Sequence, residues 1–112
     1  MKIAIPTANG KLCMHFGHCE KFVMVDIDPE NKTIVGTTEL DPPPHEPGVL
    51  PHWLGEQGTD LIIAGGMGQR AQQLFEAQDI AVVVGAPAET PEAIVKAYMD
   101  QVLETGTNAC DH

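Results

Sequence analysis

Short apolar runs alternate with turn-forming residues along this chain and predict five β-strands. Residues 2–6 (K-I-A-I-P) predict a short buried strand that ends at its proline. Residues 21–28 and 33–40 are rich in β-branched side chains and flank a tight turn, which predicts an antiparallel hairpin. Uniformly apolar runs at 60–64 and 80–84 predict two further strands, each covered on both faces.

Three helices are predicted between and after these strands. Residues 51–57 predict a short one, and a second runs from the glycine turn at 65–68 to about residue 77. The last helix begins with Thr90 as N-cap, and Gly106 is expected to stop it. Its expected apolar stripe comprises Ile94, Val95, Tyr98, Met99, Val102 and Leu103.

The order of these elements predicts a three-layer α/β domain over residues 1–106, followed by a short tail at 107–112. Right-handed crossovers favour a mixed five-stranded sheet of order 3-2-1-4-5, in which strand 2 is antiparallel. Ligands of open α/β sheets bind beyond the carboxyl ends of the parallel strands. The loops after strands 1, 4 and 5 are therefore expected to form the site.

The first of these loops carries a cluster of metal-ligand side chains. Cys13, His15, His18 and Cys19 offer two thiols and two imidazoles within seven residues, which are the ligands that soft and borderline metals prefer. The alternative is two small buried cysteines with surface histidines. The tail adds a C-x-H pair, Cys110 and His112, that could supply further ligands or close over the site. His45 and His52 are each alone, and we expect them to be surface residues.

Composition narrows the function classes. A chain of 112 residues suits one domain, and its formal charge of −10 argues against nucleic acid and anionic membranes as partners. No apolar run approaches the roughly 18 residues that cross a bilayer. Three cysteines without a secretion signal indicate reduced thiols in the cytoplasm. The chain contains no serine, which excludes serine-nucleophile chemistry.

Several segments together resemble the nitrogenase iron–molybdenum cofactor biosynthesis accessory family. They are the opening I-A-I-P-T, the loop H-F-G-H-C-E-K-F, the turn L-I-I-A-G-G-M-G and the Cys/His tail. The segment H-E-P-G-V-L-P-H-W-L also resembles the small stand-alone members of this family. The resemblance implies a ribonuclease-H-like fold and metal–sulfur cluster binding without catalysis, as in the orange proteins, which hold a molybdenum–copper sulfide cluster. The implied cofactor-binding residues are His15, Phe16, Gly17, Gly65, Gly66, Met67 and Gly68.

We therefore expect a non-catalytic carrier or scaffold for a cluster that contains molybdenum, iron or copper. Cluster-donor and cluster-acceptor proteins would be its partners, and the protein would be a monomer or weak dimer. One alternative is a simple site for zinc, copper or iron in the Cys/His loop. A second alternative is a thiol redox enzyme.

Overall fold

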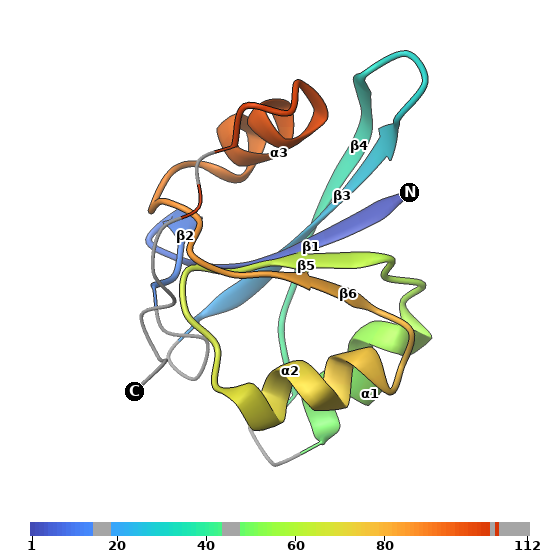
Figure 1. The fold of residues 1–112 in the computed structure, drawn as a ribbon, viewed down its shortest axis with the longest axis vertical. Helices are drawn as coiled ribbons and strands as arrows, with labels where there is room; N and C mark the ends of the chain where they lie inside the picture. Colours follow the sequence, from blue (N-terminus) through green and yellow to red (C-terminus); the bar gives the residue numbers. More distant parts are fainter. Residues whose placement is uncertain (15–18, 44–47, 104, 106–112) are drawn as a thin grey trace.

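A computed structural model describes residues 1–14, 19–43, 48–103 and 105 (Figure 1). The expected hairpin is present with its predicted bounds, and each other predicted element is found within two residues at its start. The elements in chain order are β1 (Lys2–Ala8), β2 (Lys11–Leu12), β3 (Lys21–Asp28), β4 (Thr33–Leu40), α1 (Val49–Glu56), β5 (Leu61–Ile63), α2 (Gln69–Glu76), β6 (Ala81–Val83) and α3 (Pro91–Met99).

The strands form one mixed sheet whose main path is β4-β3-β1-β5-β6. Strand β1 is antiparallel to β3 and parallel to β5, and β5 is parallel to β6. These neighbours and directions are those expected from the crossover rule. The sheet has a sixth strand that the sequence analysis missed, because the two-residue β2 pairs with the end of β1.

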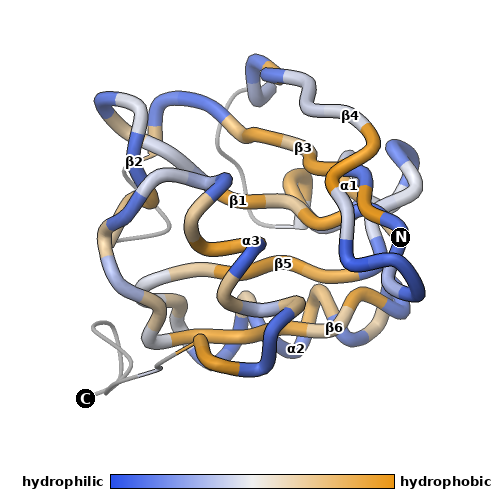
Figure 2. Tube along the Cα trace, turned by 90° about the horizontal axis from the view of Figure 1, so that it is seen from above, coloured by the Kyte–Doolittle hydropathy of each residue, from blue (hydrophilic) through white to orange (hydrophobic). Residues whose placement is uncertain are grey.

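Helix α3 covers one face of the sheet, while α1 and α2 cover the other, which gives three layers (Figure 1). Each face has its own apolar cluster. The cluster under α3 includes Ile3, Ile5 and Ile94, and the cluster under α1 and α2 includes Leu54 and Phe75. Figure 2 shows that hydrophobic residues concentrate along the central strands β1, β3 and β5. The buried side chains under α3 are thus aliphatic, whereas the cluster under α1 and α2 also holds two buried aromatic rings, Phe22 and Phe75.

The expected end of the first strand at Pro6 is wrong, because β1 continues to Ala8. Residues 9 and 10 connect β1 to β2 with φ angles of 56° for Asn9 and 79° for Gly10. Both values lie in the left-handed region that a two-residue hairpin turn of type I′ requires, and Asn-Gly is its favoured sequence. The turn returns the chain to pair with β1, which extends that strand beyond its proline.

Helix α3 begins as predicted but ends early. The Thr90 hydroxyl accepts a hydrogen bond from the Ala93 backbone N–H at 3.3 Å, so the predicted N-cap is confirmed. The helix ends at Met99 because Gln101 takes a left-handed φ of 60° and the Val102 N–H donates to the Ala97 carbonyl. This is a Schellman ending.

The expected apolar stripe of α3 is consequently wrong at its end. Val102 lies beyond the helix with 66% of its surface exposed, although Leu103 still packs against the core. The predicted stop at Gly106 lies outside the described residues. The three helices have eight, eight and nine residues, so within the described part of the chain none is long and apolar enough to cross a membrane.

Candidate functional site

Strands β1, β5 and β6 end on the same side of the sheet, which we call the carboxyl edge (Figure 1). Two backbone hydrogen bonds tie the loops that leave these strands. The Leu12 N–H donates to the Glu89 carbonyl at 2.9 Å, and the Gly85 N–H donates to the Gly65 carbonyl at 2.9 Å. The three loops expected to form the site therefore lie together.

The glycine turn, residues 65–68, lies directly against the loop that follows β1. A methyl group added at Gly65 would stand 3.0 Å from Leu12 Cδ2, 3.0 Å from Met14 Cα and 3.1 Å from Met14 Sδ. These separations are too short for ordinary van der Waals contact. Glycine is therefore needed here for close approach, and the predicted proximity of the two loops is confirmed.

Cys13 and Cys19 border the segment that we call the thiol loop, residues 13–19. Thr7 pairs with Leu12, whose side chain packs in the cluster under α3. Cys13 follows directly after β2 and is buried. Cys19 packs against the cluster under α1 and α2. Both thiols thus lie at the carboxyl edge, at the two ends of the thiol loop.

The two thiols also interact electrostatically. Burial raises the pKa of Cys19 to about 11, and the nearby charge of an ionised Cys13 adds to this rise. Cys13 is itself buried, with 7% of its surface exposed. Both groups are present as thiols rather than in a disulfide. At neutral pH Cys19 is therefore protonated, and a metal that binds the Cys19 thiolate must displace this proton.

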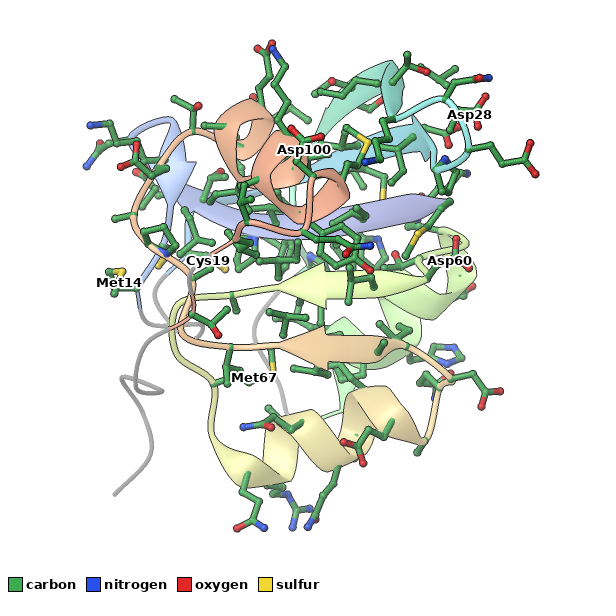
Figure 3. The ribbon with its side chains drawn as sticks, turned by 45° about the horizontal axis from the view of Figure 1, so that its top comes forward. Met14, Cys19, Asp28, Asp60, Met67 and Asp100 are labelled. Carbon is green, nitrogen blue, oxygen red and sulfur yellow. The ribbon has the colours of Figure 1, made fainter. Side chains whose placement is uncertain are left out.

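Figure 3 shows Met14, Cys19 and Met67 at one end of the sheet, with Asp28 and Asp60 at the other. Met67, in the glycine turn, is fully buried, and its carbonyl accepts a hydrogen bond from the Gln72 side chain at 2.9 Å. Gly68 is exposed and precedes the first residue of α2. The described part of the carboxyl edge is thus rich in sulfur.

Several predicted site residues lie outside the described residues, and the structure does not test them. They are His15, Phe16, Gly17, His18, Cys110 and His112. Within the described part of the chain, no three His, Cys, Asp or Glu side chains gather closely enough to hold a metal ion. The described residues therefore supply two of the four predicted ligands of the thiol loop, Cys13 and Cys19.

Of the two isolated histidines, His45 also lies outside the described residues. The His52 side chain is 67% exposed and its Nε2 lies 3.2 Å from Glu56 Oε1, one helical turn further along α1. Its predicted role as a surface residue is confirmed.

Sequence analysis missed the contacts that fix the ends of the thiol loop. The Cys13 N–H donates to the Pro6 carbonyl at 2.8 Å, and the Glu20 N–H donates to the Thr7 carbonyl at 2.8 Å. The Glu20 carboxylate also accepts the Asn9 N–H at 2.8 Å. The Asn-Gly dipeptide was a usable signal, because a two-residue hairpin turn there implies a strand directly before Cys13.

Comparison with known proteins identifies related chains along nearly the whole sequence. The family model described as "Dinitrogenase iron-molybdenum cofactor" matches residues 1–101. An uncharacterized protein of Methanocaldococcus jannaschii, MJ0580, is 31% identical over 107 residues, which cover 93% of this chain and 90% of that protein.

Solved structures agree with this match. The crystal structure of PH0822 has a TM-score of 0.85 and 28% identity, with 94% of each chain covered. The apo form of the orange protein from Desulfovibrio gigas has a TM-score of 0.73 and 21% identity, and the alignment covers 96% of this chain and 93% of that protein. At that identity, the likeness to the orange protein concerns the fold alone.

Proposed function

Because this chain belongs to the dinitrogenase iron–molybdenum cofactor family, we propose that it is a non-catalytic carrier or scaffold for a metal–sulfur cluster. The cluster would contain molybdenum, iron or copper and would be cargo, taken from a donor protein and passed to an acceptor in the cytoplasm. We also propose that the fold is ribonuclease-H-like, as the family resemblance implies.

The observation that carries this proposal is the placement of the two thiols. Cys13 and Cys19 lie at opposite ends of one loop, yet they are close enough for the charge of Cys13 to act on Cys19. Met14, the residue after Cys13, lies against the glycine turn. Thiolates are the preferred protein ligands of iron–sulfur clusters and of copper in its monovalent state. His15 and His18, between the thiols in sequence, would add imidazole ligands or N–H donors toward sulfide.

The state of Cys19 supports a carrier rather than a thiol redox enzyme. A nucleophilic or redox-active cysteine has a lowered pKa, because the thiolate is the reactive form. Burial instead raises the pKa of Cys19 to about 11. Such a thiol is a slow nucleophile at neutral pH, but it can still bind a metal that displaces its proton.

The same thiol pair supports a second candidate function, a simple site for one zinc, copper or iron ion. An absorption spectrum of anaerobically purified protein, combined with analysis of Mo, Fe, Cu, Zn and sulfide, separates the two. Intense visible charge-transfer bands with bound sulfide are expected for a cluster carrier. Colourless protein with stoichiometric zinc would contradict the carrier and establish the simple site.

Variants locate the cargo on the chain. Cys13→Ala and Cys19→Ala should each lose most of the bound metal, because each removes one of the two described thiols. Met24→Leu is the matched control, since it removes a buried sulfur from the middle of β3, in the cluster that Cys19 packs against. Cys110→Ala tests whether the tail adds a ligand. Full metal retention in both thiol-loop variants would refute the proposed site.

A further inference from the structure

Glu20 holds the exit of the thiol loop through both its backbone and its side chain. Its backbone N–H donates to the Thr7 carbonyl at 2.8 Å. Its carboxylate Oε1 accepts the backbone N–H of Asn9, also at 2.8 Å. Glu20, the exposed residue after Cys19, thus connects the end of the thiol loop to the last part of β1 and to the turn that follows β1.

The entry of the loop is fixed to the same strand. The Cys13 N–H donates to the Pro6 carbonyl, which is the neighbour of the carbonyl that Glu20 uses. Adjacent residues of β1 therefore hold the two ends of the loop, and the separation of the two thiols depends on both attachments. The entry is held within the paired backbone of β1 and β2. The exit relies partly on a side chain.

That side chain can be changed without disturbing the core. Thr7, whose hydroxyl donates to the Lys21 carbonyl at 3.1 Å, is buried, so its replacement would also alter packing. The Glu20 carboxylate is exposed and contacts a turn amide. Its removal frees the Asn9–Gly10 turn from the loop exit and leaves the backbone contact of Glu20 in place.

We propose that Glu20 is a positioning residue for Cys19. Its carboxylate holds the turn after β1 against the exit of the thiol loop, and this keeps Cys19 half-buried against the cluster under α1 and α2. The consequence for cargo binding rests on the proposed carrier function. The positional role itself does not depend on that function, because it concerns the exposure of the Cys19 thiol in the metal-free protein.

Three variants of the full chain test this role. Glu20→Ala removes the acceptor, and Glu20→Gln removes the charge but keeps an acceptor oxygen. Glu89→Ala is the matched control, because Glu89 is also exposed and acidic at the carboxyl edge, and it contacts Leu12 through its backbone carbonyl. Two measurements follow on metal-free protein: hydrogen exchange at the Asn9 amide, and iodoacetamide alkylation of Cys19 resolved by mass spectrometry.

In Glu20→Ala, the Asn9 amide should exchange faster by about threefold to tenfold, the range that loss of one ordinary hydrogen bond predicts. Alkylation of Cys19 should accelerate as well. Glu20→Gln should restore most of both values, and Glu89→Ala should match wild type. Unchanged exchange and alkylation in Glu20→Ala would overturn the proposal. Equal effects in Glu20→Ala and Glu89→Ala would also overturn it, because they would indicate a general charge effect.

A cobalt(II) titration, followed through thiolate charge-transfer absorption, separates this inference from the proposed function. We expect weaker cobalt binding in Glu20→Ala than in Glu20→Gln. Wild-type protein that takes up no cobalt through its thiols would count against the carrier function, while exchange and alkylation would still decide the positioning role. Equal cobalt affinity in wild type and Glu20→Ala, despite faster alkylation, would refute a contribution of Glu20 to binding.

Discussion

The glycine turn approaches the start of the thiol loop closely at Gly65, so Gly65→Ala tests how the carboxyl edge is built. The new methyl group would stand 3.0 Å from Met14 Cα and 3.0 Å from Leu12 Cδ2. A side-chain atom such as Leu12 Cδ2 can rotate away, but a backbone atom such as Met14 Cα moves only with its loop. We therefore expect the start of the thiol loop to be displaced.

The size of the effect follows from these distances. Ordinary contacts of a Cβ atom begin at 3.4 Å, so the Met14 backbone must retreat by several tenths of an ångström. Inserting a carbon into packed surroundings costs about 1–3 kcal/mol of unfolding free energy. In a domain of this size each kcal/mol lowers Tm by about 4–8 °C. The positive-φ residues do not include Gly65, so the cost comes from contact and not from backbone strain.

Urea unfolding measures the stability change, and amide chemical shifts of Cys13 and Met14 report the displacement. Gly36→Ala is the matched control, because a methyl group at Gly36 in β4 would meet nothing within 4 Å. Gly36→Ala should remain within about 1 kcal/mol of wild type. A Gly65→Ala protein with wild-type stability and unchanged Cys13 and Met14 shifts would refute the close approach of the two loops.

Two further predictions concern the thiol and the last helix. The raised pKa of Cys19, about 11, means that the folded state keeps a proton that the unfolded state has lost above an ordinary thiol pKa of about 8.5. The free energy of unfolding should therefore fall as pH rises from about 9 to 11, and urea unfolding at several pH values measures this fall. Cys19→Ala should flatten that part of the dependence on pH. Parallel curves for wild type and Cys19→Ala would contradict the raised pKa of Cys19. Thr90→Ala should cost about 1 kcal/mol by thermal unfolding, because it removes the acceptor of the hydrogen bond from the Ala93 amide. Thr105→Ala is the control, because Thr105 is exposed and lies beyond the end of α3.

Much of the fold could be predicted because its main signals are local. Apolar runs and turn residues identified the hairpin of β3 and β4 with its bounds, and the strand–helix alternation gave the parallel part of the sheet. Thr90 and Pro91 marked the start of α3 because capping depends on a few adjacent residues. Its end was missed because Gln101 adopts the left-handed conformation that sequence rules reserve mainly for glycine and asparagine.

The site was predictable in outline for a different reason. The carboxyl ends of parallel strands must lie together, so the loop after β1 was placed beside the glycine turn without any contact being known. The tertiary contacts that shape the site could not be predicted in this way. Strand β2 has only two residues, too few for a periodic pattern, and the bond from Asn9 to the Glu20 carboxylate joins residues eleven positions apart.

We propose that the environment of Cys19 suits cargo binding better than catalysis. Desolvation opposes a bare thiolate at Cys19, and a second thiolate at Cys13 opposes it further. Both costs fall when a cationic metal centre lies at the thiols, because the metal replaces the protons and supplies the missing positive charge. In this proposal the empty site keeps Cys19 as a neutral thiol of low reactivity, and bound cargo would stabilise its thiolate. A catalytic thiol would need the reverse arrangement, in which the protein itself stabilises the thiolate.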